Sequence, residues 1–156
     1  MAKPQVLIAG GGIGGMTAAL ALLQRGFDVT VFEQAPELKE LGAGLQLAAN
    51  GTRVLIEMGL EEALKPVICE AAAKEVRLWN TGQRWKLFDL GADSIARFGA
   101  PYWMAHRGEL HRVLTEAVVA LKPGAVVTGA LATGFEQDDR GVTLLLADGR
   151  RVRGDL

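Results

Sequence analysis

The amino-acid sequence predicts an α/β fold that combines a Rossmann-like βαβ core with an antiparallel β-meander. An apolar run at residues 6–9 leads directly into a glycine cluster at residues 10–15, and a second strand-like segment follows at residues 28–32. Between these segments the apolar side chains recur at helical spacing. Near the end of the chain, three strand-like segments are separated by turns rich in Asp and Gly. This order is typical of a parallel sheet that is followed by consecutive antiparallel strands.

The composition is that of a globular protein and narrows the possible classes. The 156 residues are enough for one domain with a core, which we take as residues 1–156. A net charge of −1 gives no attraction to nucleic acid or to a membrane surface, so we expect neither as a partner. The longest uncharged apolar run, near residues 16–23, is too short to span a bilayer. Cys69 is the only cysteine, which fits a cytoplasmic protein, and we expect it in the core.

The first strand, the glycine cluster and the following helix form a Gly-x-Gly-x-x-Gly motif. Gly10 allows a sharp turn, Gly12 lets a pyrophosphate approach the backbone, and Gly15 permits close packing of helix and strand. The N–H groups of the first helical turn then face the phosphates. The predicted phosphate-binding residues are Gly10, Gly12, Ile13, Gly14 and Gly15.

Glu33 follows the second predicted strand and completes the motif. Its carboxylate can accept hydrogen bonds from a ribose diol. No Lys or Arg follows until Lys39, so a 2′-phosphate on that ribose is disfavoured. Glycine loops also occur as plain turns, but strand, glycine cluster, helix, strand and acid in this order indicate dinucleotide binding.

The middle of the chain is predicted to mix short helices and strands. Residues 34–41 form a loop, and residues 42–47 are a second glycine-rich segment. Asn50 is the expected N-cap of a helix that continues through Met58 and ends at Gly59. The remaining expected elements are a short helix at residues 60–68, a hairpin of residues 74–80 and 84–90, and a loop at residues 91–101.

The last third returns to the parallel core and then forms the meander. A short strand at residues 102–105 leads into a helix that stops at Pro123, and residues 125–128 are a third candidate parallel strand. The meander strands are expected at residues 131–137, 142–147 and 151–156. Because no turn, cap or helix follows the last strand, we expect the chain to be the N-terminal part of a longer protein.

The pattern of His, Cys and Ser residues in the sequence indicates neither a metal site nor a serine hydrolase. His106 and His111 are five residues apart and lie on different helix faces, and no cysteine or acidic pair accompanies them. We therefore expect no metal. Ser94 is the only serine and lacks a nucleophile-elbow pattern, which argues against a serine hydrolase. No residue has the pattern of a catalytic base, so the catalytic residues stay unassigned.

Several of these segments together resemble a known family. The family is that of the single-component FAD-dependent aromatic hydroxylases, the class A flavoprotein monooxygenases of the p-hydroxybenzoate hydroxylase fold. The likeness is greatest to salicylate, 3-hydroxybenzoate and 6-hydroxynicotinate hydroxylases. The segments that carry it are the glycine cluster, Phe-Glu-Gln-Ala-Pro at residues 32–36, Leu-Gly-Ala-Gly-Leu-Gln-Leu at residues 41–47 with Asn50 after it, and His-Arg-Gly-Glu-Leu at residues 106–110.

The resemblance implies how the chain binds FAD. It implies that Glu33 holds the adenosine ribose with Gln34 beside it, and that the main chain around Leu131 lies against the adenine. It further implies that Arg107 reaches the phosphate and ribityl region, although an exposed arginine at a helix start is the plainer reading. The second glycine-rich segment contributes Gly44 and Gln46, which lie toward the flavin. The hydroxynicotinate branch has histidine at the position of Gln46, and the p-hydroxybenzoate branch has arginine at that of Gly42.

The resemblance also implies an activity for the parent protein. NADH or NADPH would reduce the flavin, and one oxygen atom of O₂ would then be transferred to a small aromatic or heteroaromatic acid. Another FAD- or NAD-dependent oxidoreductase would share the first 35 residues but not the two later motifs. A non-catalytic dinucleotide-binding module is a third reading. The sequence leaves open whether the protein forms a homo-oligomer.

Overall fold

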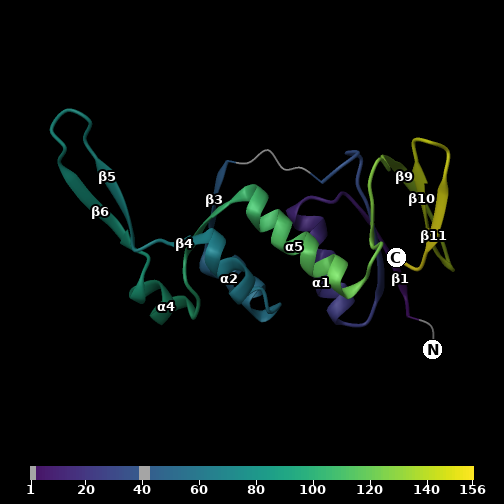
Figure 1. Cartoon of the computed structure of the whole chain (residues 1–156), viewed down its shortest axis with the longest axis horizontal. Coiled ribbons are helices and arrows are strands. Elements are labelled where there is room, and N and C mark those ends of the chain that lie inside the picture. Colours follow the sequence, from purple (N-terminus) through teal and green to yellow (C-terminus); the bar gives the residue numbers. More distant parts are fainter. Residues whose placement is uncertain (1–2, 39–42) are drawn as a thin grey trace. The chain divides into compact units, whose positions relative to one another are not determined.

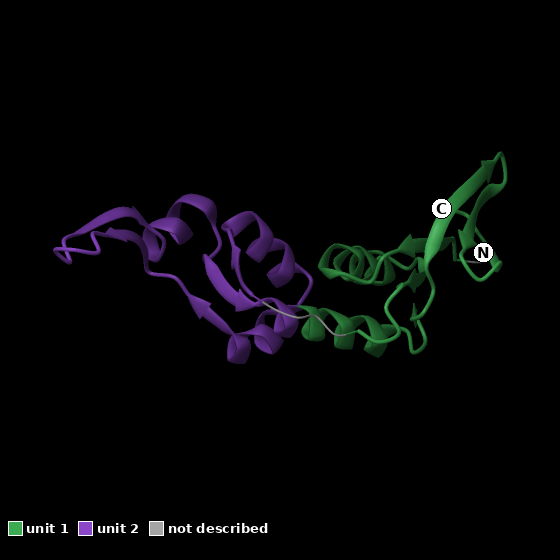
Figure 2. Ribbon diagram, turned by 90° about the horizontal axis from the view of Figure 1, so that it is seen from above, with its two compact units in different colours: residues 1–40, 111–156 green, residues 41–110 purple. Residues whose placement is uncertain are grey.

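The computed structural model describes residues 3–38 and 43–156 of the chain. It divides into two compact units, shown in different colours in Figure 2. Unit 1 comprises residues 1–40 and 111–156, and unit 2 comprises residues 41–110. The dividing point at residue 110 falls within one long helix, α5 (Arg107–Leu121).

Unit 1 is built on a parallel three-stranded sheet with the order β1 (Gln5–Ala9), β2 (Asp28–Phe32), β8 (Val126–Val127). Helix α1 (Ile13–Gln24), labelled in Figure 1, connects β1 to β2 and packs against β2. Val29 and Val31 of β2 are fully buried, and so is Met16 of α1. These features confirm the predicted βαβ core.

The part of α5 in unit 1 belongs to the same core. Val113, Leu114 and Val118 are at most 3% exposed and recur at helical spacing. At the helix end, the Nζ atom of Lys122 lies 2.6 Å from Oδ1 of Asp28. The Lys122 ammonium also donates a 2.8 Å hydrogen bond to the Val29 carbonyl, which ties the end of the helix to β2.

The meander follows β8 and confirms the three predicted antiparallel strands. Its strands are β9 (Ala132–Asp138), β10 (Gly141–Leu146) and β11 (Arg151–Gly154), with β10 in the centre. Leu144 and Leu146 of β10 are buried with Phe32 and Ala130 in one hydrophobic cluster. The meander therefore packs its apolar side chains against the end of β2.

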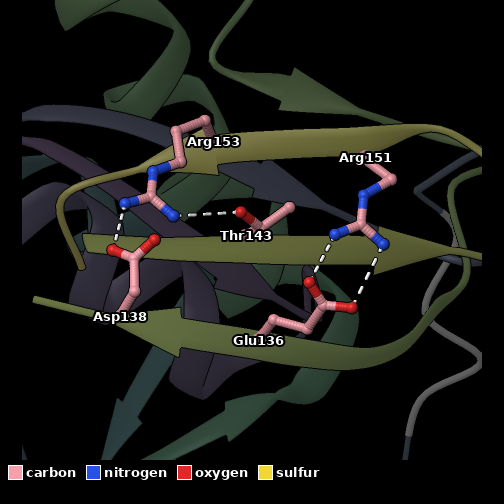
Figure 3. A network of polar contacts seen from close by, with 5 residues as sticks. All are labelled: Glu136, Asp138, Thr143, Arg151 and Arg153. Atoms are coloured by element: carbon pink, nitrogen blue, oxygen red, sulfur yellow. Dashed lines mark hydrogen bonds and ion pairs between the residues drawn. The ribbon is translucent and has the colours of Figure 1, made fainter. Parts of the chain in front are cut away.

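Charged side chains connect the two outer meander strands across the central one (Figure 3). Arg151 of β11 forms a two-pronged ion pair with Glu136 of β9. Arg153 pairs with Asp138 and donates a 3.2 Å hydrogen bond to Thr143 of β10. The four charged side chains are exposed, so each ion pair adds little to stability, but together they mark the solvent face of the sheet.

The last predicted meander strand, residues 151–156, is too long. β11 ends at Gly154, and the next two residues bond to β1 instead. The Leu7 amide donates to the Leu156 carbonyl at 2.8 Å, and the Asp155 amide donates to the Gln5 carbonyl at 2.8 Å. A Cβ at residue 154 would lie 2.7 Å from Cγ of Leu7, so only glycine fits where the chain meets β1.

Unit 2 contains an antiparallel sheet with the order β3 (Gly44–Leu47), β7 (Trp103–His106), β4 (Ile68–Glu70). A separate hairpin of β5 (Ala73–Arg77) and β6 (Arg84–Asp89) confirms the predicted one. The helical segments are α2 (Ala49–Glu57), α3 (Glu61–Leu64), a 3₁₀ turn (Lys65–Val67) and α4 (Ala92–Phe98).

Three expectations for unit 2 are wrong, and a fourth is wrong only at its end. Asn50 is not the N-cap, because α2 begins at Ala49 and Ala48 occupies the cap position. The predicted helix at residues 60–68 is confirmed by α3 and the 3₁₀ turn, but it ends at Val67, before strand β4 begins at Ile68. Residues 91–101 are not a loop throughout, since α4 lies within them and buries Ser94. Cys69 is exposed on β4 instead of packed in the core.

No helix among residues 3–38 and 43–156 is long and apolar enough to cross a membrane. The same residues contain no group of three or more His, Cys, Asp and Glu side chains that could hold a metal ion.

Candidate functional site

The glycine turn after β1 depends on two glycines for its shape. Gly10 has a φ of +106°, a conformation that side-chain-bearing residues rarely adopt, and its amide donates to the Phe32 carbonyl at 2.8 Å. A Cβ at Gly15 would lie 1.9 Å from the Gly10 carbonyl oxygen and 3.4 Å from Cγ2 of Ile8. Both glycines are therefore required by the close approach of α1 to β1.

The N-terminus of α1 is suited to an anion. Gly12 takes the N-cap position in an extended conformation, and within this fully described helix no side chain caps the first turn. That turn also contains no acidic residue. Gly14 is exposed, and a Cβ there would meet no atom within 4 Å. The first-turn N–H groups thus have no side-chain cap, and the positive end of the helix dipole favours an anion there.

Glu33 is fixed beside this turn by two backbone amides. Its Oε2 atom accepts a 2.6 Å hydrogen bond from the Gly11 N–H, and its Oε1 atom accepts a 2.8 Å bond from the Ala35 N–H. The bond from Ala35 is the main reason that the pKa of Glu33 lies below its usual value, and the Gly11 bond adds to it against the effect of burial. The side chain is therefore a charged acceptor, and its remaining lone pairs can accept from hydroxyl groups.

Two pockets in unit 1 share Glu33. The first has a volume of about 90 Å³ and is lined by Gly11, Gly12, Glu33, Ala35, Glu37, Leu38 and His111. The second has a volume of about 200 Å³ and is lined by Ala9, Gly10, Phe32, Glu33, Gln34, Ala130, Leu131 and Ala132. The glycine turn, Glu33 and the start of the meander thus meet at one end of the parallel sheet.

His111 is part of the first pocket, although the sequence pattern did not assign it a role. It is 4% exposed, and its Nε2 atom lies 2.6 Å from the Gly11 carbonyl oxygen. The two residues are 100 positions apart, so no local pattern connects them. The available signal was its place on the buried face of the helix, three residues before Leu114.

The other predicted residues lie in unit 2, on β3 and at the start of α5. Gly44 pairs with His106 across the sheet, and the Arg107 amide donates to the Ala43 carbonyl at 3.2 Å. The Tyr102 hydroxyl donates a 2.7 Å hydrogen bond to Oε1 of Gln46. Gly44, Gln46 and Arg107 are all exposed.

The predicted site residues therefore fall into two groups. In unit 1 are Gly10, Gly12, Ile13, Gly14, Gly15, Glu33, Gln34 and Leu131. In unit 2 are Gly44, Gln46 and Arg107. Of the second glycine-rich motif, residues 41 and 42 lie outside the described residues.

The βαβ unit, the glycine turn and the acid after β2 define a dinucleotide-binding protein of the Rossmann type. Comparison with known families makes this specific. Residues 3–154 match the FAD binding domain family, and the chain belongs to that family.

Individual relatives agree with this assignment. The chain is 43% identical over 147 residues to a 3-amino-4-hydroxybenzoate 2-monooxygenase of Streptomyces platensis, covering 94% of the chain and 36% of that protein. It is 35% identical over 154 residues to a 6-hydroxynicotinate 3-monooxygenase of Pseudomonas fluorescens, covering 99% and 39%.

A solved structure extends the likeness to the fold. A mutant of 2-methyl-3-hydroxypyridine-5-carboxylic acid oxygenase matches with a TM-score of 0.81 and 29% identity, over 99% of the chain and 38% of that structure. The chain thus spans well under half the length of the relatives that it matches.

Proposed function

We propose that this chain is the FAD-binding part of a flavoprotein monooxygenase that hydroxylates an aromatic or heteroaromatic acid with NAD(P)H and O₂. The family match over residues 3–154 carries the FAD assignment. The substrate class is supported by the names of the three relatives, each of which acts on a ring with both a hydroxyl and a carboxyl group.

The residues of unit 1 fit the adenosine half of FAD. The diphosphate would bind at Gly12 and the first turn of α1, where amides and the helix dipole favour negative charge. Glu33 would accept hydrogen bonds from the ribose hydroxyls, because its charge is retained and its position is fixed. The adenine would lie in the pocket beside Gln34 and Leu131.

The predicted residues of unit 2 also carry groups that are suited to a flavin nucleotide. Arg107 supplies a guanidinium for a phosphate oxygen, and Gly44 has no side chain to obstruct the flavin. Gln46 cannot titrate, and its Oε1 atom already accepts from Tyr102, so its amide nitrogen remains a hydrogen-bond donor. When bound, the flavin supplies electron transfer from the nicotinamide and activation of O₂.

Oxygen incorporation by the full-length protein tests the proposed reaction. The protein would be incubated with NADH or NADPH, ¹⁸O₂ and a panel of hydroxylated benzoates and hydroxypyridine carboxylates. We expect one labelled oxygen atom in at least one product. Benzoate and nicotinate serve as matched controls without the ring hydroxyl.

Two other experimental outcomes would favour a different function. Flavin reduction without labelled product from any ring would favour a different FAD-dependent oxidoreductase. Tight FAD binding without reduction by either nicotinamide would favour a non-catalytic module.

A further inference from the structure

We propose that His111 is a positioning residue, which holds the glycine turn in the geometry that receives the adenosine diphosphate part of FAD. This inference rests on the proposed FAD-binding function. It concerns a side chain that the Gly-x-Gly-x-x-Gly motif does not contain.

The direction of the His111 hydrogen bond is fixed by chemistry. A carbonyl oxygen can only accept, so the Nε2 atom that lies 2.6 Å from the Gly11 oxygen must carry a hydrogen. The ring is 4% exposed, so water cannot readily replace this bond. A buried carbonyl that lost its donor would be left unsatisfied.

Gly11 is consequently held at both of its backbone polar groups. Its N–H donates to Glu33 at 2.6 Å, and its C=O accepts from His111 at 2.6 Å. A Cβ at Gly11 would lie 3.1 Å from Cβ of Glu33, which shows how closely the two residues pack. His111 and Glu33 therefore act on the turn from two sides through one residue.

Because the peptide bond between Gly11 and Gly12 is planar, the His111 contact also constrains the backbone at the proposed phosphate site. In a trans peptide the C=O of one residue and the N–H of the next point in opposite directions. By fixing the Gly11 C=O, His111 also fixes the Gly12 N–H, which points away from the imidazole. Gly12 is the N-cap of α1, where the diphosphate is proposed to bind. His111 thus orients a phosphate donor without touching the cofactor.

A histidine that only fills space would behave differently from one that positions the turn. Gln can place its amide nitrogen near the position of Nε2, Asn is too short to reach it, and Leu fills a similar volume without a donor. The His111→Gln, His111→Asn and His111→Leu variants of the full-length protein therefore separate hydrogen bonding from packing. His106→Leu replaces the other, exposed histidine and serves as the matched control.

The readouts are the dissociation constants of FAD and FMN and the thermal midpoint of the apoprotein. We expect His111→Leu and His111→Asn to weaken FAD by about tenfold, while His111→Gln stays within about threefold of wild type. FMN lacks the adenosine and the diphosphate link, so its affinity should stay unchanged. His106→Leu should bind both flavins like wild type.

A double-mutant cycle with Glu33→Gln provides the decisive comparison. Because both residues act through Gly11, His111→Asn should weaken FAD less in the Glu33→Gln background than in wild type. Additive losses would overturn the proposal, as would equal losses for Gln and Asn at residue 111, or equal losses for FAD and FMN. A wild-type protein that binds no FAD would instead refute the proposed function itself.

Discussion

Replacing Glu33 by glutamine tests the link between the glycine turn and the second strand. Glutamine preserves the shape of the side chain but has one acceptor oxygen and one NH₂ group. In the wild type, both carboxylate oxygens accept backbone hydrogen bonds, from Gly11 at 2.6 Å and from Ala35 at 2.8 Å. In Glu33→Gln the NH₂ group must therefore face one of these two N–H donors.

The expected loss follows from that geometry. A hydrogen bond to a charged group contributes about 1.5–3 kcal/mol, and the variant loses one such bond and weakens the other. Since Glu33 is partly exposed, we take the lower part of this range and expect a destabilisation of about 2 kcal/mol at neutral pH. FAD should bind more weakly as well, and FMN should be almost unaffected because it has no ribose diol of adenosine.

The difference in folding stability between wild type and Glu33→Gln should depend on pH in one direction. The hydrogen bond from Ala35 is the largest contribution to the lowered pKa of Glu33 in the folded protein. The extra stability is therefore fully present above the unfolded pKa of glutamate, about 4.3, and is lost as pH falls through the lower folded value. Between pH 7 and pH 5 the gap between wild type and Glu33→Gln should stay constant, and below about pH 4.3 it should shrink.

Urea unfolding of the apoprotein at several pH values measures this gap, and fluorescence titration gives the FAD and FMN affinities. Equal stability of wild type and Glu33→Gln at pH 7 would refute the assigned hydrogen bonds. Equal losses of FAD and FMN affinity would refute the ribose role but leave the structural role standing.

Substitutions at Gly15, Gly12 and Arg107 test other parts of the site. Gly15→Ala would place a Cβ 1.9 Å from the Gly10 oxygen, so the apoprotein should lose about 3 kcal/mol of stability in urea unfolding. Gly14→Ala is its control, because a Cβ there meets no atom within 4 Å, and apoprotein stability should stay the same or rise slightly. Gly12→Val should weaken FAD by at least ~10-fold in a titration of the full-length protein, and wild-type affinity would show that the loop is only a turn. Arg107→Leu should lower flavin affinity more than Arg107→Lys, with a gap that shrinks as salt is added, whereas a salt-independent gap would indicate packing.

The sequence predicted unit 1 well because local signals and tertiary structure agree there. The first two strands are short segments rich in apolar residues. Gly141, which ends the first meander turn, and Gly149, which lies in the second, have φ values of +134° and +89°. In these segments the residues favour the same conformation that the fold requires.

Long-range contacts explain the errors in unit 2. The start of α2 is stabilised by Thr52, whose hydroxyl bonds to the Pro101 carbonyl at 2.7 Å, a partner 49 residues away. Helix α4 lies between Gly91 and Gly99, and glycines at both ends suggest a loop when the burial of Ser94 is unknown. Neither contact is visible in a local window of sequence.

In the candidate site, too, local motifs reveal some residues and long-range contacts reveal others. The motif identified Gly10, Gly15 and Glu33, and the structure gives each of them a definite contact in the turn. The sequence pattern gives His111 no role, because its contact with Gly11 spans 100 residues and no local motif includes it.

The most direct test of the central claim is the identity of the cofactor in the purified full-length protein. The protein would be denatured, and the released small molecules would be identified by absorbance and mass and quantified against protein. We predict one FAD for each polypeptide, or stoichiometric uptake of FAD by a colourless apoprotein. A protein that takes up no FAD but binds a nicotinamide dinucleotide at the glycine turn would contradict the account.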